Sequence, residues 1–519
     1  MATNTMRILM IASENDALPG AKVGGVGDVL RDLPRALVKE NCTVDVVLPS
    51  YGFLARLPQL QRVAEYQVTF AEHRQNISLL RLPAKNGVTH YIVDHPLFST
   101  AGETVYCNDG HDRPFATDAS KFALFCKSVA AALVEGYLPW PEVVHCHDWH
   151  AAMFLVLAEY DPESEPLKAI PSVYTIHNLA LQGVRPYAGD SSSLQSWFGD
   201  VQVDKNRVGD PRAYDCINLM RAGINLADKV HTVSPSYASE IQQPSDHEAG
   251  MYGGEGLEQD IRQRAESGDV IGIINGCEYP RKADYSKPSR KRIASLANTE
   301  LLAWAGKRRT LASAHWIAKQ RLDHWLNIKN PGMSLLSIGR ITDQKVRLLL
   351  QQQGGKTALE IMLDRLSSND VFIMLGSGTP ELEDAFTAIA GKYPKFIFLN
   401  GYAGELSDQL YNFADLFVMP SSFEPCGISQ MLAMRAGQPC LVNGVGGLKD
   451  TVDDKKTGFV FSGEDIQQQM QNMLQRFDEA LKLYNNNRVI WDGLCKNAAK
   501  VRFTWRESAR EYVQRLYGR

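Results

Sequence analysis

The chain lacks the cysteine pattern of a disulfide-stapled or zinc-thiolate protein. Its 519 residues include nine cysteines, an odd number, and these form no C-x-x-C pair. The first residues, MATNT, have neither the basic nor the apolar region of a signal peptide. No apolar run is long enough to cross a bilayer. These absences favour a protein of the reducing cytoplasm with no membrane partner.

An excess of positive charge is also missing. The formal net charge is −4 at pH 7, whereas proteins that bind nucleic acid are usually basic. Repeats of solenoid period and low-complexity tracts are absent as well. A small metabolite or a neutral polymer is therefore a better partner than nucleic acid.

What the sequence does contain is a regular alternation of short apolar runs with helical patterns. In the first half the predicted strands are residues 7–12, 44–48, 89–93, 143–146, 172–176, 229–233 and 270–274. In the second half they are residues 334–338, 371–375, 396–399, 416–419, 440–442 and 459–461. Continuously apolar runs are typical of strands buried on both faces. Their alternation with helices such as residues 119–133 predicts mostly parallel sheets covered on both sides.

The length predicts two domains, because 519 residues exceed what one hydrophobic core usually serves. Residues 277–329 separate the two alternating halves. They are rich in Lys and Arg, contain Pro280 and Pro288, and show a helical pattern over 300–318. The predicted fold class is therefore α/β, with two doubly wound Rossmann-like domains facing a central cleft, where such folds bind ligands.

A glycine loop follows the first predicted strand. Residues 22–29 read KVGGVGDV, so a buried strand ends in a loop that opens a helix and presents backbone N–H groups to an anion. Lys22 adds a full positive charge. The loop lacks the third glycine of a dinucleotide fingerprint, which disfavours an NAD-type site. A tight strand-to-helix turn would explain the glycines but not the lysine beside them.

Polar residues follow two further strands of the first half. His145 and His147 point to one face of an extended segment, but zinc needs three or four ligands and no convincing set lies nearby, so we predict no metal. Asp148 and Trp149 suit sugar binding, because one accepts hydroxyl hydrogen bonds and the other offers an apolar face. His177 can bond to hydroxyls or serve as a structural histidine.

Two cations follow the first strand of the second half. Arg340 and Lys345 can neutralise a diphosphate, with Arg gripping two oxygens and Lys acting as a point charge; the alternative is a solvated basic loop. No Asp-x-Asp triplet, which many transferases use to hold a divalent ion, is present. A site without a metal must take its positive charge from side chains and helix N-termini.

Three more features come later in the second half. Glu424 precedes a predicted helix over residues 426–436, where its carboxylate can accept sugar hydroxyls and offset positive charge at an anomeric carbon, or merely face a helix N-terminus. Residues 444–448 form a second glycine loop. Tyr402 either stacks on a base or fills the core.

These segments resemble the bacterial glycogen synthases and plant starch synthases, glucosyltransferases of the two-domain GT-B fold. The similarity runs in order through residues 22–29, 145–151, 174–183, 232–238, 274–276, 423–427 and 446–448. Any one segment is a weak signal, but seven in register are specific.

The resemblance implies transfer of glucose from ADP-glucose to the non-reducing 4-OH of an α-1,4-glucan such as glycogen, with UDP-glucose as the alternative donor. It further implies retention of the anomeric configuration and neither a metal nor a cofactor. The implied catalytic residues are Glu424, His177, Arg340, Lys345 and Asp148. The implied donor-binding residues are Lys22, Gly24, Gly25, Tyr402, Cys426, Gly427, Ile428, Ser429, Gly446 and Gly447. The resemblance further implies that Lys22, Arg340 and Lys345 hold the diphosphate. It implies that His177 and Glu424 position the glucose and that Tyr402 stacks on adenine.

The resemblance also gives each region a role. Residues 1–280 would form the acceptor-side domain, 281–330 a linker with added helices, and 331–495 the nucleotide-sugar-binding domain. Residues 496–519 would form a helix that crosses back to the first domain.

The sequence departs from the family pattern in several places. Residues 277–280 read CEYP where Ile/Val-Asp and then Trp-Asn-Pro are usual, Val346 replaces a usual Gly, and residues 290–327 match poorly. Two alternatives therefore stay open. One is a related retaining transferase that uses UDP-glucose or a small acceptor, and the other is a non-catalytic glucan-binding regulator.

Overall fold

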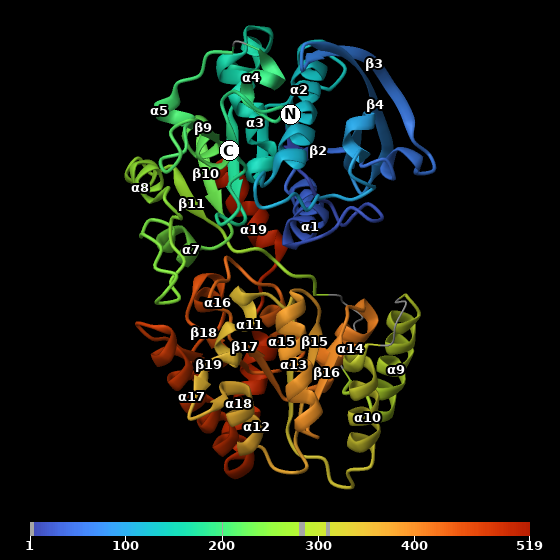
Figure 1. Cartoon of the computed structure of the whole chain (residues 1–519), viewed down its shortest axis with the longest axis vertical. Helices are drawn as coiled ribbons and strands as arrows, with labels where there is room; N and C mark the ends of the chain where they lie inside the picture. Colours follow the sequence, from blue (N-terminus) through green and yellow to red (C-terminus); the bar gives the residue numbers. More distant parts are fainter. Residues whose placement is uncertain (1–4, 200, 280–285, 308–311, 519) are drawn as a thin grey trace. The chain divides into compact units, whose positions relative to one another are not determined.

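The chain forms two compact units. The computed structural model describes residues 5–199, 201–279, 286–307 and 312–518. Unit 1 consists of Met1–Ser245, Gly253–Gly276 and Trp505–Arg519, and unit 2 consists of Asp246–Tyr252 and Cys277–Thr504. Figure 1 labels the elements of both units. The segment predicted as a linker, residues 281–330, contributes its described helices to unit 2.

Unit 1 is built on a nine-stranded sheet with the order β11-β10-β7-β6-β1-β2-β5-β4-β3. The strands from β11 to β5 are mutually parallel. They are β1 (Met6–Ile11), β2 (Cys42–Pro49), β5 (Val88–Asp94), β6 (Val143–His147), β7 (Ser172–Ile176), β10 (Lys229–Thr232) and β11 (Val270–Gly272). Every strand predicted in the first half is confirmed.

The antiparallel edge of this sheet was not predicted from the sequence. β3 (Gln61–Phe70) pairs with β4 (His73–Lys85), which pairs with β5. Along both strands exposed residues alternate with buried ones over part of the length, so no continuous apolar run marks them in the sequence. A second antiparallel pair, β8 (Val184–Pro186) with β9 (Cys216–Asn218), is too short to show a pattern.

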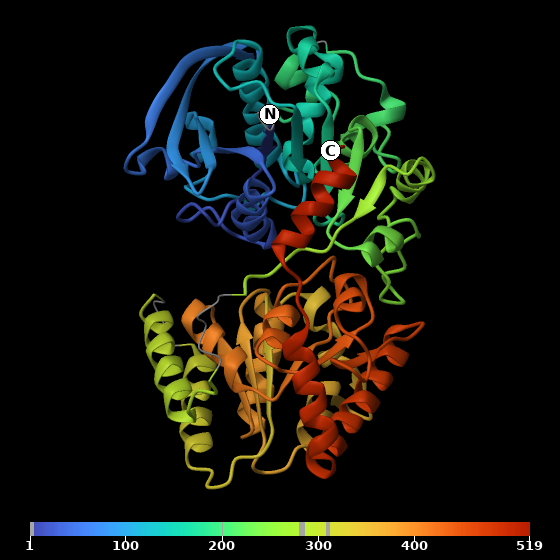
Figure 2. The same cartoon turned by 180° about the vertical axis from the view of Figure 1, so that it is seen from behind.

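Helices pack around the sheet of unit 1 (Figure 1). They are α1 (Gly25–Lys39), α2 (Ala116–Val134), α3 (Asp148–Tyr160), α4 (Leu194–Phe198), α5 (Lys205–Val208), α6 (Leu219–Leu226), α7 (Pro235–Glu240), α8 (Glu258–Glu266) and α19 (Trp505–Glu511). The 3-10 turns are η1 (Leu54–Arg56), η2 (Pro96–Ser99) and η3 (Pro162–Ala169). The C-terminal helix α19 continues into a π-helical turn, η4 (Tyr512–Leu516), and packs against α1 (Figure 2).

Unit 2 is built on a six-stranded, wholly parallel sheet with the order β16-β15-β12-β17-β18-β19. Its strands are β12 (Ser334–Ile338), β15 (Val371–Gly376), β16 (Phe396–Asn400), β17 (Leu416–Met419), β18 (Cys440–Asn443) and β19 (Gly458–Phe461). All were predicted. On β15 the side chains of Phe372 and Met374 enter one apolar core and those of Ile373 and Leu375 enter the other. Both faces are thus buried, which explains the continuous apolar runs.

The helices of unit 2 are α9 (Arg290–Gly306), α10 (Ser313–Leu326), α11 (Asp343–Leu350), α12 (Ala358–Arg365), α13 (Pro380–Lys392), α14 (Gly404–Phe413), α15 (Ser429–Arg435), α16 (Gly446–Thr451), α17 (Ile466–Asn486) and α18 (Arg488–Lys500). A short hairpin joins β13 (Gln352–Gln353) to β14 (Lys356–Thr357). Along the described part of the chain, no helix is both long and apolar enough to cross a membrane. All nine cysteines are free thiols.

Two helix predictions in unit 2 were wrong in their bounds. The pattern over residues 300–318 belongs to two helices, α9 and α10, and its residues 308–311, like Pro280, lie outside the described residues. The helix predicted from residue 426 begins only at Ser429. Gly427 has a φ of +77°, a left-handed conformation that an α-helix does not accommodate.

Candidate active site

The glycine loop after β1 binds a carboxylate of its own chain. The amides of Val23 and Gly24 donate to Glu14 Oε2 at 2.8 and 2.5 Å. The Tyr106 hydroxyl donates to Glu14 Oε1 at 2.7 Å. A Cβ on Gly27 would lie 3.3 Å from Glu14 Oε2, so a glycine there leaves room for the carboxylate. Glu14 thus occupies the amides of Val23 and Gly24, and the binding of a phosphate by this loop stays a prediction.

Lys22 has carboxylate partners in the same loop region. Its Nζ lies 2.7 Å from Asp28 Oδ1 and 3.4 Å from Asp16 Oδ2. Arg31 also pairs with both of these carboxylates. About a third of the Lys22 side chain is exposed. A phosphate bound by Lys22 would therefore compete with internal carboxylates for the ammonium group.

Asp148 and His177 are brought together by the neighbouring strands β6 and β7. Asp148 opens α3 and its Oδ1 accepts the His177 amide at 2.7 Å. Burial raises the pKa of the Asp148 carboxyl to about 7. Burial lowers the pKa of His177 to about 3, so its imidazole is neutral at neutral pH. Asp148 thus holds the backbone turn that carries His177.

The histidines of β6 and their neighbours form a buried hydrogen-bonded cluster. His147 Nδ1 lies 3.0 Å from His177 Nε2. His145 contacts the hydroxyls of Tyr517 at 2.8 Å and Thr175 at 2.6 Å. Both ring nitrogens of His145 are thereby engaged within the protein. Across the described residues, no group of three or more His, Cys, Asp or Glu is arranged to hold a metal ion.

The expectation that Trp149 offers a face to a sugar was wrong. Its side chain is buried, with its ring edge-on to the rings of Phe115 and Phe122. A Cβ on Gly183 would come within 2.3 Å of the indole. The strand that ends at His147 runs directly into α3, and the first turn of that helix directs Trp149 into the core.

In unit 2 the structure pairs two of the predicted catalytic residues. Lys345 lies in the first turn of α11, after β12, and its ammonium group forms an ion pair with the Glu424 carboxylate. Glu424 follows β17, the neighbouring strand, and is buried. Ser421 Oγ donates to the same carboxylate oxygen at 3.3 Å. Carboxyl ends of adjacent parallel strands meet at one sheet edge, which explains how residues 79 positions apart come together.

Arg340 follows the same strand as Lys345 and is exposed. Among the residues that the structure describes, none forms a hydrogen bond or ion pair with its guanidinium. Its five N–H donors are therefore open to a ligand.

The glycines of the second loop serve close backbone packing. Gly447 N donates to Glu424 O at 3.1 Å. A Cβ on Gly446 would lie 2.1 Å from Glu424 O, and one on Gly447 would lie 2.2 Å from Cys426 O. These two glycines let the start of α16 lie directly against the backbone that carries Glu424.

The remaining predicted donor residues are distributed around these loops. Ile428 and Ser429 start α15, and the Gln430 side chain donates to Cys426 O and Gly427 O at 3.1 and 3.0 Å. Tyr402, between β16 and α14, is 69% exposed. Its exposure excludes the alternative that it fills the core.

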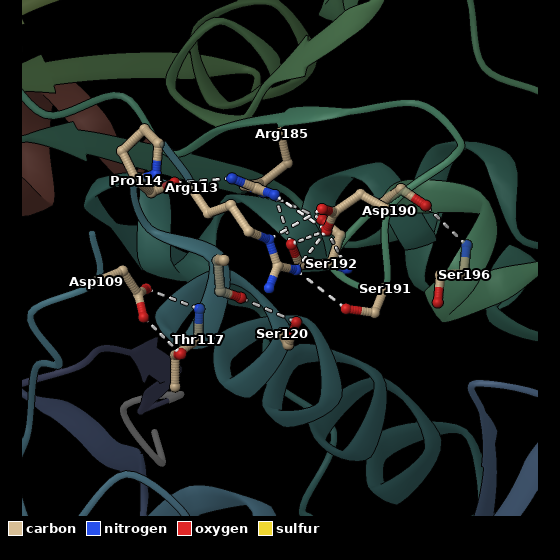
Figure 3. Close-up of polar contacts among 12 residues, drawn as sticks. Asp109, Arg113, Pro114, Thr117, Ser120, Arg185, Asp190, Ser191, Ser192 and Ser196 are labelled. Atoms are coloured by element: carbon tan, nitrogen blue, oxygen red, sulfur yellow. Dashed lines mark hydrogen bonds and ion pairs between the residues drawn. The ribbon is translucent and has the colours of Figure 1, made fainter. Parts of the chain in front are cut away.

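Sequence reasoning missed an ion-pair cluster in unit 1, which Figure 3 shows. Arg113 donates to Asp190 Oδ2 from Nε at 3.0 Å and to Oδ1 from Nη2 at 2.8 Å. These bonds hold the pKa of the Asp190 carboxyl below its usual range. Arg185 also reaches Asp190, at 3.1 Å, and Pro114 O, at 2.9 Å. The cluster anchors the loop between η2 and α2, which also carries Tyr106, the partner of Glu14.

Glu14, the carboxylate bound by the glycine loop, was also not predicted, and of these residues it alone had a signal in the sequence. Glu14 lies two residues after the predicted strand 7–12 and precedes a glycine loop, so an acid near a strand end was visible. Arg113 and Asp190 are 77 residues apart in irregular segments, and no periodicity connects them.

Comparison with known proteins defines the class. A family model described as starch synthase catalytic domain matches residues 7–263, and one described as glycosyl transferases group 1 matches residues 333–478. The catalytic domain of starch synthase IV from Arabidopsis thaliana, solved bound to ADP and acarbose, shares the fold with a TM-score of 0.74 at 24% identity over 99% of each chain. Sucrose-phosphate synthase from Thermosynechococcus elongatus has a TM-score of 0.55 at 16% identity over 98% of each chain. The two parallel-sheet units are those of a GT-B glycosyltransferase.

Curated relatives show to which family of glycosyltransferases the chain belongs. Glycogen synthases from Streptococcus equi subsp. equi, Streptococcus sanguinis and Clostridium novyi are 33%, 34% and 30% identical, each over 98% of this chain and 98% of the relative. The chain therefore belongs to the glycogen and starch synthase family of glycosyltransferases. The predicted resemblance and the predicted α/β fold class are both confirmed.

Proposed function

We propose that this glycosyltransferase extends an α-1,4-glucan from ADP-glucose, with retention of configuration and without a metal ion. The observation that carries the proposal is the ion pair of Lys345 with the buried Glu424, together with the exposed Arg340 that follows the same strand. Two cations and one carboxylate are the charges that the departure of a nucleoside diphosphate from glucose requires.

Each of these groups has a role in the proposed reaction. As the bond from the anomeric carbon to the diphosphate breaks, negative charge grows on the leaving oxygen and positive charge grows on the sugar. Arg340 and Lys345 stabilise the first, and the Glu424 carboxylate stabilises the second. Because Lys345 and Glu424 are held against each other at a packed sheet edge, these two groups need little reorganisation during the reaction.

Residues of unit 1 serve the same reaction in this proposal. The neutral His177 imidazole and Asp148 act on sugar hydroxyls, and Lys22 with the amides of Gly24 and Gly25 contributes to phosphate binding. In unit 2, Tyr402 stacks on the nucleobase. Cys426, Gly427, Ile428, Ser429, Gly446 and Gly447 form the loops around the donor.

Retention requires a specific geometry of attack. In a double displacement a carboxylate first bonds to the anomeric carbon, but the ion pair with Lys345 makes Glu424 a poor nucleophile. We infer instead that the acceptor 4-OH attacks on the face that the diphosphate leaves. The new glycosidic bond forms as the old bond breaks, and the acceptor proton passes to the departing phosphate oxygen. A mass gain of one glucosyl unit on the protein, after rapid quenching with donor alone, would overturn this route.

The donor is tested directly with a glycogen primer. Purified protein is supplied with radiolabelled ADP-glucose or UDP-glucose, with and without EDTA, and incorporation into polymer is counted. We expect faster incorporation from ADP-glucose and no loss on chelation. Digestion of the product by an α-1,4-specific amylase tests the linkage. Failure of both donors to label polymer contradicts the proposal and favours a small acceptor or a glucan-binding regulator.

A further inference from the structure

The loop that carries Tyr402 packs against helices α9 and α10. These helices pack against each other, α10 packs against β16, and α9 packs against α14 (Figure 1). β16 ends at Asn400 and α14 begins at Gly404, so Tyr402 lies in the short connection between them. The position of this connection determines where the exposed Tyr402 ring stands.

The first support is the Trp304 indole. A Cβ built on Gly401 would lie 2.4, 2.5 and 2.6 Å from Cδ2, Cε2 and Cε3 of Trp304. Three ring atoms at nearly equal distance mean that the face of the indole covers Gly401. A side chain at residue 401 would therefore force the loop and the indole apart, and the indole limits how far the loop can move toward α9.

The second support is His315, on α10. Its Nε2 lies 3.0 Å from Asn400 O, so this nitrogen carries the proton and donates to the carbonyl. The rings of His315 and Trp304 have their centroids 6.0 Å apart. The same connection is fixed on its other side, where Gly401 N donates to Gly376 O at 3.1 Å and Asn400 Nδ2 donates to Glu383 Oε2 at 3.1 Å. The Tyr402 backbone is thus held between β15 and α13 on one side and the helical pair on the other.

We propose that Trp304 and His315 are positioning residues that set the nucleobase specificity of the donor site through Tyr402. This inference rests on the proposed function, in which Tyr402 stacks on the base of a nucleoside diphosphate sugar. A purine presents a larger face for stacking than a pyrimidine, so the ring position affects the two bases unequally. Both supporting residues lie between the two segments that the family models match, residues 7–263 and 333–478.

The test compares the donor kinetics of variants at Trp304 and at Gly401, the two residues that are in contact. Trp304→Ala should raise the KM for ADP-glucose about five- to tenfold, because base–aromatic stacking is worth at least that much when it is lost. The ratio of kcat/KM for ADP-glucose to that for UDP-glucose should fall by a similar factor, with kcat within about twofold of wild type. Trp304→Phe should restore both values, since a phenyl ring keeps a flat face against Gly401.

A second variant guards against simple misfolding of α9. Gly401→Ala changes no residue of the helices and should displace the loop relative to the indole, so we expect it to change KM and the donor ratio in the same direction. Trp316→Ala is the matched control, because Trp316 lies on α10 but is 57% exposed. It should leave both donor constants unchanged.

A double-mutant cycle separates action through Tyr402 from a general structural role. In a Tyr402→Ala background, Trp304→Ala should change the donor KM by less than about twofold, because the ring that it positions is gone. Unchanged KM and unchanged donor ratio in both Trp304→Ala and Gly401→Ala would overturn the inference, as would full additivity in the cycle. If the wild type transfers glucose from neither donor, the proposed function fails instead. Calorimetric binding of ADP and UDP to the same variants then tests the inference alone.

Discussion

The two units hold their charged groups differently. In unit 1, Lys22 pairs with Asp28 and Asp16, and the first glycine-loop amides bind Glu14. In unit 2, the Lys345 ammonium has the buried Glu424 as its carboxylate partner and Arg340 is exposed. Both lysines thus have internal carboxylate partners, and the difference is that unit 2 also presents an exposed cation, Arg340, that no described residue pairs. Substitutions in unit 2 should therefore affect turnover most, and substitutions in unit 1 should affect donor binding and stability.

The largest expected effect is that of Lys345→Ala. Loss of the ammonium removes stabilisation of the leaving diphosphate, and removal of one such electrostatic contact lowers turnover by about 10²–10³-fold. The measurement is kcat with glycogen primer, with circular dichroism to check the fold. Lys319→Ala is the control, because Lys319 forms an exposed ion pair with Asp323 in the same unit. Near-normal turnover of Lys345→Ala would remove the central role given to unit 2.

The next effect is that of Glu424→Gln, which keeps the shape of the side chain and removes its charge. We expect kcat to fall about 10²-fold with the KM for glucan within about twofold, because the carboxylate acts on charge that develops in the transition state. Glu405→Gln, at an exposed acid of the same unit, should change neither constant. A rise in glucan KM without a fall in kcat would instead assign Glu424 to acceptor binding.

We expect acid to lower the stability of unit 1 more than that of unit 2. The described residues hold six buried histidines in unit 1 and one in unit 2; those of unit 1 are His90, His145, His147, His150, His177 and His231. Burial lowers the pKa of all six. As pH falls, these imidazoles become protonated in the unfolded chain before they do in the folded one. Their neutral burial therefore costs no stability above about pH 6.5, and the folded state loses stability as pH falls below that value. For His177, with a folded pKa of about 3, the loss at pH 5 is about 2 kcal/mol.

Two carboxyls in unit 1, Asp148 and Asp45, act in the opposite direction, because burial raises the pKa of each. The Asp148 pKa is raised to about 7, so its contribution is present at low pH and is lost as pH rises from about 4 to 7. Two carboxyls do not offset six imidazoles, and the net effect of acid remains destabilising. Hydrogen exchange at pH 5 and pH 7.5, corrected for its intrinsic pH dependence, should show peptides of unit 1 opening first. Equal loss of protection in both units would contradict this difference.

The same contrast explains what the sequence could predict. Every parallel strand was found, because strands such as β15 are buried on both faces and read as apolar runs. The polar residues at strand ends were found because parallel sheets gather them at one edge. What a one-dimensional pattern does not contain is the partner of each charge. The Lys345–Glu424 pair depends on the neighbouring positions of β12 and β17, and the Gly427 conformation that delays α15 depends on local backbone geometry.

The smallest expected effect is that of Glu14→Gln, which tests whether the glycine loop of unit 1 contributes to phosphate binding. Glu14→Gln keeps an acceptor oxygen for the amides of Val23 and Gly24 but replaces charge-assisted bonds with neutral ones, a change of about 0.5–1.5 kcal/mol. If the loop contributes to phosphate binding, the donor KM should rise about two- to tenfold while kcat stays constant. Glu165→Gln, at an exposed acid of unit 1, is the control. A lower donor KM in Glu14→Gln would show that the carboxylate competes with phosphate for the loop, and an unchanged KM would show that the loop serves the fold alone.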